Sequence, residues 1–193
     1  LDYLAAASAL AQKHGLQRHL DGARLFNAAV AAGGDPYAAA RDVTRHFDSV
    51  SVCFSKGLGA PVGSVLCGSR ELIKRAHRWR KMLGGGMRQA GVLAAAAHYA
   101  LDHQVARLAD DHALARRLAE GLQGLPGLTV EAPQTNIVFV DIAADKAAGV
   151  MAHLKARGVL ATGLYKLRFV THLDVDAAGV DRAIAAMREY FVA

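Results

Sequence analysis

Ser55-Lys56-Gly57-Leu58-Gly59-Ala60-Pro61 places one lysine in a glycine- and proline-containing connection between two apolar runs. The preceding run, 49–54, is short, alternates in polarity and contains β-branched residues, and the following run, 62–67, is also short and apolar. Both patterns predict β-strands. Lys56 is therefore expected in a tight connection at a strand end, where α/β folds position their ligand-binding groups.

The side chain of Lys56 is a candidate nucleophile. Apolar strands on both sides would desolvate it, and desolvation favours the neutral amine. A neutral amine can form a Schiff base with a carbonyl group such as that of pyridoxal phosphate. Most lysines are solvated surface residues, so this interpretation requires a second group with matching chemistry.

Asp21 has the properties of that second group. It follows the run 16–20, which is predicted as a strand, and precedes Gly22-Ala23-Arg24. A pyridine ring accepts electrons well only while its nitrogen is protonated, and a carboxylate beside the nitrogen keeps the proton there. Asp21 and Lys56 are 35 residues apart, which leaves room for a helix and a further strand. Both strand ends can therefore meet at one edge of a parallel sheet.

Four motifs occur in order along the chain. They are His19-Leu20-Asp21-Gly22-Ala23-Arg24, Ser55-Lys56-Gly57-Leu58-Gly59-Ala60-Pro61-Val62-Gly63-Ser64, Gly84-Gly85-Gly86-Met87-Arg88-Gln89-Ala90-Gly91 and Arg168-Phe169-Val170-Thr171-His172. Together they resemble the L-threonine aldolases of the low-specificity type, which belong to the beta-eliminating lyase family of type I pyridoxal-phosphate enzymes. The motifs extend over nearly all of the chain, which makes the resemblance specific.

The resemblance implies an α/β fold, the type I fold of aspartate aminotransferase and its relatives. Residues 1–103 would be the C-terminal part of the cofactor-binding large domain, and residues 104–193 a linking helix with a small C-terminal α+β domain. The implied activity is retro-aldol cleavage of L-threonine, L-allo-threonine and related β-hydroxy-α-amino acids to glycine and an aldehyde.

The resemblance also implies a role for each matching residue. Lys56 would bind the cofactor covalently and act in catalysis, Asp21 would contact the pyridine nitrogen, and Arg24 would lie beside the phenolic oxygen. Lys81 and Arg88 would reach the site and phosphate of a neighbouring subunit in a homodimer or homotetramer. Arg168 would bind the substrate carboxylate, because the carboxylate-binding arginine of the family lies in this motif. Its planar guanidinium suits a carboxylate, and alternation along the strand places it on the face opposite Phe169, although a lone strand arginine is more often part of a surface ion pair.

The N-terminal portion of the family has no counterpart in these residues. In the family that portion carries the phosphate cradle and the group stacked on the ring, so an active enzyme is expected only when this chain is combined with it. Other possibilities are an inactive fragment, a nonenzymatic basic binding module, or another type I enzyme such as an aminotransferase or cysteine desulfurase. The Gly-Gly-Gly-Met-Arg-Gln run favours the aldolases over the last group.

Composition favours a globular protein over a nucleic-acid or membrane protein. The hydrophobic content of 53% is enough for a sizeable core, no apolar run approaches a membrane span, and no targeting segment is visible. The net charge of +6 comes partly from the basic segment 74–81, but apolar residues at helical spacing in the same segment predict a solvated basic face rather than a nucleic-acid site.

The cysteines and histidines give two further expectations. Cys53 and Cys67 lie in predicted strands and are expected as buried thiols, which favours a reducing, cytoplasmic compartment. The nine histidines have no metal-ligand spacing, so no metal site is expected.

The remaining patterns predict the other elements. We expect helices over 1–14, 24–32, 36–40, 69–83, 89–101, 104–122, 146–157 and 176–191, and strands over 128–131, 136–141 and 166–171. Ser69 is the predicted N-cap of the basic helix. Residues 41–48 are expected to form an irregular surface insertion, and the apolar helix 89–101 to be deeply buried or packed against a second subunit.

Overall fold

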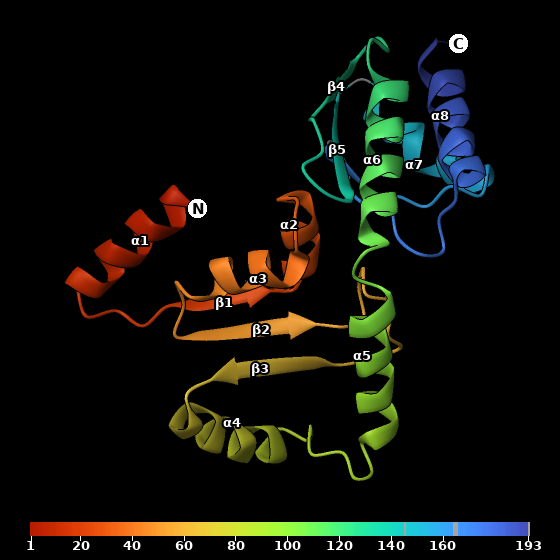
Figure 1. Cartoon of the computed structure of the whole chain (residues 1–193). Coiled ribbons are helices and arrows are strands. Elements are labelled where there is room, and N and C mark those ends of the chain that lie inside the picture. Colours follow the sequence, from red (N-terminus) through yellow and green to blue (C-terminus); the bar gives the residue numbers. More distant parts are fainter. Residues whose placement is uncertain (145, 164–165, 193) are drawn as a thin grey trace. The chain divides into compact units, whose positions relative to one another are not determined.

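The computed structural model describes residues 1–144, 146–163 and 166–192. The chain forms two compact units, Leu1–Arg107 and Leu108–Ala193, which we call the first and second unit (Figure 1). The division falls four residues after the boundary suggested by the sequence.

The first unit is built on a mixed sheet with the order β1-β2-β3. Strands β1 (His19–Gly22) and β2 (Ser49–Cys53) are parallel, with Gly22 opposite Val52. Strand β3 (Ser64–Gly68) returns antiparallel to β2. The other elements of this unit are α1 (Asp2–Lys13), α2 (Leu25–Ala31), α3 (Pro36–Thr44), α4 (Arg70–Met82) and α5 (Gly91–His103).

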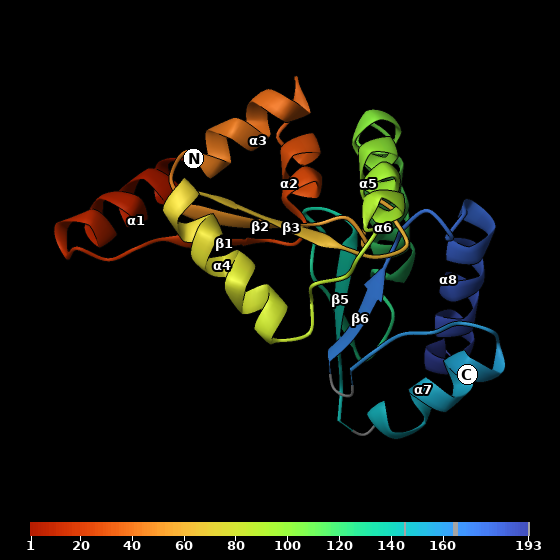
Figure 2. The same cartoon turned by 90° about the horizontal axis from the view of Figure 1, so that it is seen from below.

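Alternation along β2 gives the sheet two different faces. Val50 and Val52 pack with Leu25 and Ala29 of α2 and with α3, which together form the core of the unit. Ser49 and Ser51 line an open pocket on the α4 side. The crossover helices α2 and α3 therefore lie on the apolar face and α4 on the polar face (Figure 2).

Helix α3 is longer than expected, and the prediction of an irregular segment over 41–48 is wrong for its first half. The Asp35 side chain accepts hydrogen bonds from the backbone N–H groups of Tyr37 and Ala38, at 3.0 and 3.2 Å, and Pro36 occupies the first turn. Val43 continues the apolar face of the helix and packs on the core. The charged residues therefore form the solvent-facing side of a helix. Its other side has few apolar residues, and these pack on the core.

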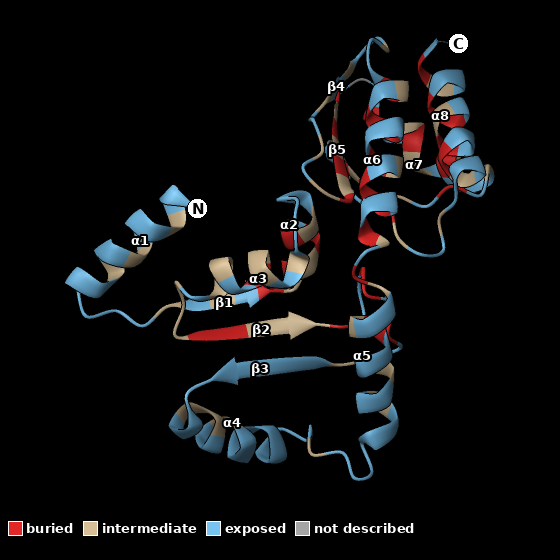
Figure 3. Cartoon of the chain, in the orientation of Figure 1, coloured by how far each residue is buried: buried red, intermediate tan, exposed pale blue. Residues whose placement is uncertain are grey.

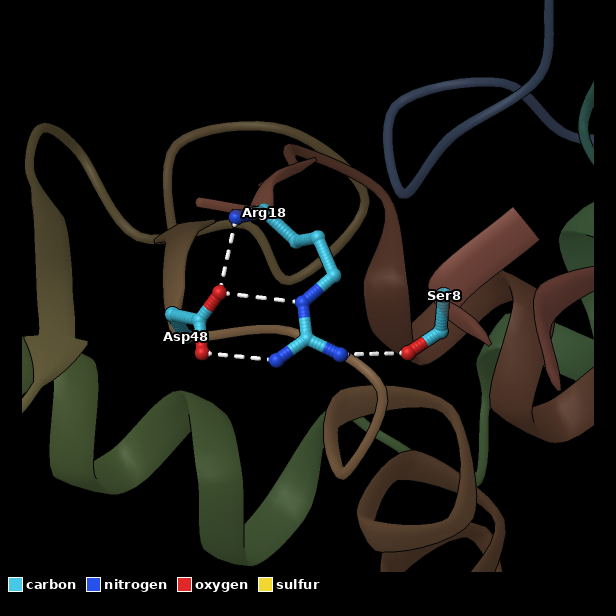
Figure 4. A network of polar contacts seen from close by, with 3 residues as sticks. All are labelled: Ser8, Arg18 and Asp48. Atoms are coloured by element: carbon cyan, nitrogen blue, oxygen red, sulfur yellow. Dashed lines mark hydrogen bonds and ion pairs between the residues drawn. The ribbon is translucent and has the colours of Figure 1, made fainter. Parts of the chain in front are cut away.

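Arg18 and Asp48 join the starts of β1 and β2 (Figure 4). Nε and Nη2 of Arg18 donate to the two carboxylate oxygens at 3.0 and 2.7 Å, and its backbone N–H donates to the same group at 2.8 Å. Nη1 donates to Oγ of Ser8 on α1 at 2.5 Å. The hydrogen bonds that Asp48 accepts from Arg18, first those from the side chain and then that from the backbone, lower the pKa of Asp48 to about 2.

The second unit has an antiparallel sheet with the order β4-β5-β6. It contains α6 (Leu108–Leu122), β4 (Leu128–Val130), β5 (Ile137–Ile142), α7 (Ala147–Ala156), β6 (Lys166–Val170) and α8 (Ala177–Val192). Buried side chains alternate along β5 and β6 and meet the inner faces of the three helices. This is the expected α+β layer, although α6 begins at Leu108 rather than at residue 104.

Burial differs strongly between the units (Figure 3). The second unit has a continuous core, whereas all five residues of β3 are exposed. Of the described residues of α5, Ala100 alone is buried, so this chain does not bury the helix deeply, and the alternative of packing against a second subunit stays a prediction. Cys53 and Cys67 are free thiols, but neither is buried as expected: Cys53 is half-buried, and Cys67 lies on β3, where every residue is exposed.

Two kinds of feature are absent from the described residues. No helix in that part of the chain has the length and apolar character needed to cross a membrane. Over the same residues, no group of three or more His, Cys, Asp or Glu side chains could hold a metal ion.

Candidate active site

The carboxyl ends of β1 and β2 bring two of the predicted site residues to one edge of the sheet. The strands are parallel and in register to Gly22 and Val52, so the loops that follow them leave the sheet side by side. Asp21 is the penultimate residue of β1, and Lys56 lies in the loop after β2. The sequence-based expectation that both strand ends meet at one edge is confirmed.

The backbone is unusually close at the end of β1. A Cβ atom on Gly22 would lie 2.7 Å from the carbonyl oxygen of Ser51 and 3.3 Å from Cγ1 of Val50. Glycine is therefore required for the two strands to approach this closely beside Asp21. The Asp21 side chain is exposed, and its Oδ1 accepts a hydrogen bond from the Ala23 N–H at 3.1 Å.

The loop after β2 is a compact turn that begins at Lys56. The N–H of Gly59 donates to the Lys56 carbonyl at 2.9 Å, and the N–H of Ala60 donates to the Phe54 carbonyl at 2.9 Å. The side chains of Phe54 and Leu58 are buried and hold the two sides of the loop. Lys56 itself is exposed, so this chain does not supply the desolvation expected from the flanking strands, because β2 ends at Cys53 and β3 begins only at Ser64.

Arg24 lies between the two loops. It occupies the N-cap position of α2 and is half-buried. Together with Ala23 and Asn27 it lines one side of a small crevice whose other side is formed by Gly57 and Leu58. The structure therefore brings Arg24 next to the lysine loop, as well as next to Asp21 in the chain.

Lys81 and Arg88 lie on the connection between α4 and α5. Lys81 is in the last turn of α4, Arg88 is in the turn before α5, and both are exposed. Gly84 has a φ of +85°, and a Cβ on Gly86 would lie 2.6 Å from Cδ of Lys81. The three glycines thus let the chain reverse closely against the lysine stem. Ser69 caps α4 as predicted, with its Oγ accepting from the Leu72 N–H at 3.2 Å.

Arg168 lies on β6 in the second unit. Its neighbours Leu167 and Phe169 are buried, whereas Arg168 is on the opposite face and half-buried, as the alternation predicted. Its backbone N–H donates to the carbonyl of Thr162 at 2.7 Å. The guanidinium is thus carried by a regular strand rather than by a flexible loop.

One residue at the lysine loop was missed by the sequence interpretation. Nη1 of Arg107 donates to the carbonyl oxygen of Gly57 at 3.1 Å. The two residues are 50 positions apart, and the acceptor is a backbone atom. A contact of this kind leaves no spacing or composition signal in the sequence.

The donor set at this sheet edge fits pyridoxal phosphate. A primary amine, a carboxylate and a guanidinium lie at two adjacent strand ends. The amine can react with the aldehyde of that cofactor, the carboxylate can pair with its protonated pyridine nitrogen, and the guanidinium can pair with its phenolic oxygen. Because Gly22 has no side chain, the backbones of the two strands approach closely beside the carboxylate.

Comparisons with known proteins agree with this chemistry. The family model described as beta-eliminating lyase matches residues 1–145. The low specificity L-threonine aldolase of Escherichia coli O157:H7 is 46% identical over 189 residues, which cover 98% of this chain and 55% of that protein. This chain therefore spans about half the length of such curated relatives.

Solved structures give the fold. A candidate L-allo-threonine aldolase from Listeria monocytogenes EGD-E has a TM-score of 0.75 at 22% identity, covering 97% of this chain and 55% of that one. Serine palmitoyltransferase of Sphingomonas wittichii has a TM-score of 0.70 at 19% identity, covering 95% of this chain and 49% of that one. The fold is that of the type I pyridoxal-phosphate enzymes, as the sequence motifs predicted.

Proposed function

The chain belongs to the beta-eliminating lyase family, and from that premise we propose that it is part of a pyridoxal-phosphate-dependent aldolase. Its substrates would be L-threonine, L-allo-threonine and related β-hydroxy-α-amino acids, and its products glycine and an aldehyde. The observation that carries the proposal is the occurrence of Asp21 and Lys56 at adjacent ends of parallel strands. The 46% identity to a low specificity L-threonine aldolase supports the choice of substrate.

The chain's own residues have distinct tasks in this proposal. When bound, pyridoxal phosphate supplies an electron sink for the electrons released as the Cα–Cβ bond of the substrate breaks. Lys56 would hold the cofactor through Nζ. Asp21 keeps a proton on the pyridine nitrogen, and Arg24 provides a positive charge beside the phenolic oxygen.

Three further cations bind anionic groups in this proposal. Arg168 binds the substrate carboxylate through its planar guanidinium. Lys81 and Arg88 extend from the exposed α4–α5 connection to the phosphate site of a second copy in a homodimer or homotetramer. The glycines between them, which let the chain reverse closely, support that geometry.

The complete site is proposed to need the N-terminal region that the relatives have beyond the matched part. The exposed strand β3 and the exposed lysine are consistent with this requirement, because both leave surface for another polypeptide to cover. The free thiols of Cys53 and Cys67 suit a reducing compartment. We therefore place the enzyme in the cytoplasm, in amino-acid metabolism.

Cofactor trapping tests the proposal. The complete enzyme is incubated with pyridoxal phosphate, reduced with borohydride and digested, and the modified lysine is identified by mass spectrometry. We expect the label on Lys56, no label on this peptide and no threonine cleavage in Lys56→Ala, and normal labelling in Lys74→Ala, a variant of an exposed lysine on α4.

Product analysis separates the aldolase from the other type I enzymes. L-Threonine should yield glycine and acetaldehyde. A 2-oxo acid that forms only when a second 2-oxo acid is added to accept the amino group would instead identify an aminotransferase. Absence of the label from Lys56 in a folded wild-type enzyme would contradict any function that depends on this cofactor.

A further inference from the structure

Arg107 contacts the turn that carries the catalytic lysine of the proposed enzyme. The arginine is the last residue of the first unit and follows α5 after a short connection. Its side chain is half-buried, and Nη1 donates to the Gly57 carbonyl oxygen at 3.1 Å. Gly57 is the residue directly after Lys56 and is itself buried.

The turn itself provides no other hydrogen-bond donor for the Gly57 carbonyl. The hydrogen bond from Gly59 N–H to the Lys56 carbonyl makes Gly57 and Leu58 the two central residues of a β-turn. In such a turn the carbonyl of the second residue has no partner within the turn. A buried carbonyl without a partner is strongly disfavoured, and a cationic donor makes a stronger hydrogen bond than a neutral one.

We propose that Arg107 is a positioning residue that fixes the Lys56 turn and thereby the point from which the lysine side chain extends. The inference rests on the proposed function, because it concerns how readily Nζ of Lys56 reaches the cofactor. Nothing in the reaction requires Arg107 to touch the cofactor or the substrate. The arginine acts through the backbone of Gly57.

The position of Arg107 gives this contact a second consequence. The same residue ends the first unit and precedes the first residue of α6, Leu108. The backbone at the junction of the two units is thus hydrogen-bonded, through one side chain, to the lysine turn.

Three variants separate the hydrogen bond from the packing of the side chain. Arg107→Met keeps an unbranched apolar stem and removes the donor, whereas Arg107→Lys keeps a cationic donor. Arg188→Met is the matched control, since Arg188 donates in the same way to a backbone carbonyl, that of Gly121, at 3.2 and 3.3 Å in the second unit.

The first readout is hydrogen exchange of residues 55–60 in the complete enzyme without cofactor. We expect about tenfold faster exchange at the Gly59 and Ala60 amides in Arg107→Met, as for loss of a hydrogen bond to a charged group. Arg107→Lys should recover most of the protection, and Arg188→Met should match the wild type. The second readout is the rate at which borohydride-stable pyridoxal phosphate accumulates on Lys56, which should fall about tenfold in Arg107→Met.

The outcomes distinguish this inference from the function on which it rests. A folded Arg107→Met enzyme with wild-type exchange and wild-type trapping overturns the positioning role. Faster exchange together with no trapping on Lys56 in the wild type supports the contact with the turn but overturns the proposed function, and with it the catalytic part of the inference. If Arg107→Met does not fold, Arg107→Gln replaces it: the Gln amide ends two bonds short of Nη1, so wild-type protection in that variant overturns the role.

Discussion

Asp48 shows at the scale of one residue how the first unit holds its strands together. Both carboxylate oxygens accept hydrogen bonds from Arg18, which lower the pKa of Asp48 to about 2. A carboxyl group has an ordinary pKa near 3.9 in an unfolded chain. The folded state therefore binds this proton more weakly than the unfolded state does, and the stabilisation is present above about pH 4 and lost as the pH falls toward 2.

The first prediction follows from this sign. Asp48→Asn should lower the urea midpoint of unfolding at pH 5 to 7, and the difference from the wild type should shrink between pH 4 and pH 2. Asp110→Asn, which changes an exposed carboxylate in the first turn of α6, is the control and should lower the midpoint much less, since only a weak interaction with the helix N-terminus is lost. A wild-type midpoint for Asp48→Asn at pH 6 would mean that the ion pair does not stabilise the fold.

Gly22 gives a second prediction at the same scale. A Cβ at this position would approach a backbone oxygen, which cannot move aside as a flexible side chain can. Gly22→Ala should therefore cost about 1–3 kcal/mol of stability and reduce cofactor binding through Asp21. Gly91→Ala is the control, because nothing lies within 4 Å of a Cβ there and Gly91 begins α5. Equal stability of the two variants by urea unfolding would refute the close-approach argument.

Single residues also mark the limit of the sequence. The strand ends at Asp21 and Lys56 were predictable because a lysine or an acid directly after a β pattern has a defined place in a parallel sheet. The exposure of Lys56 was not predictable, since it depends on what covers the loop. The contact of Arg107 with Gly57 could not be predicted either, because any side chain of sufficient length could reach a backbone carbonyl.

At the scale of elements, α3 illustrates how a helix was underestimated. The charges of residues 41–48 suggested a loop, but Asp35 caps the helix and Val43 extends its apolar side. Tyr37 then connects α3 to α5, because its hydroxyl donates to the Leu101 carbonyl at 2.5 Å. Burial, followed by the nearby Asp102 and Asp35 carboxylates, raises the pKa of Tyr37 and keeps this donor protonated.

The third prediction tests the connection between these helices. Tyr37→Phe keeps the ring that packs edge-on against Phe26 at 5.6 Å and removes only the hydroxyl. The loss of this hydrogen bond should cost about 1 kcal/mol or less, since the tyrosine is partly exposed. Tyr3→Phe on α1, where the ring is 81% exposed, should cost nothing. Thermal or urea unfolding followed by circular dichroism measures both variants.

At the scale of the whole chain, the elements were predicted better than their burial. Apolar periodicity identified each helix and strand that the structure describes in the second unit, since each has one face on a shared core. In the first unit the same periodicity could not show which faces remain open. Helix α5 and strand β3 have apolar sequences, yet most of their residues are exposed in this chain.

The α4–α5 connection is the clearest of these open surfaces. Trp79, Leu83 and Val92 are 57%, 81% and 69% exposed. Lys81 and Arg88 lie between Trp79 and Val92 in the sequence. Contiguous apolar surface on a globular chain usually marks a contact. A two-fold symmetric contact would let each subunit give both cations to its partner and receive the same pair in return.

The last prediction is that cofactor binding and assembly of the complete enzyme depend on each other. A ligand that binds only the assembled state stabilises that state, so dilution should release subunits and cofactor together. Light scattering and the visible absorbance of bound cofactor, followed across one dilution series, should therefore fall in parallel. Arg88→Ala should weaken cofactor binding about tenfold or more while leaving the unfolding midpoint nearly unchanged, whereas Arg70→Ala, at the exposed start of α4, should change neither. A cofactor-loaded, active monomer would refute the shared site, because the cofactor would then bind without Lys81 and Arg88 of a second subunit.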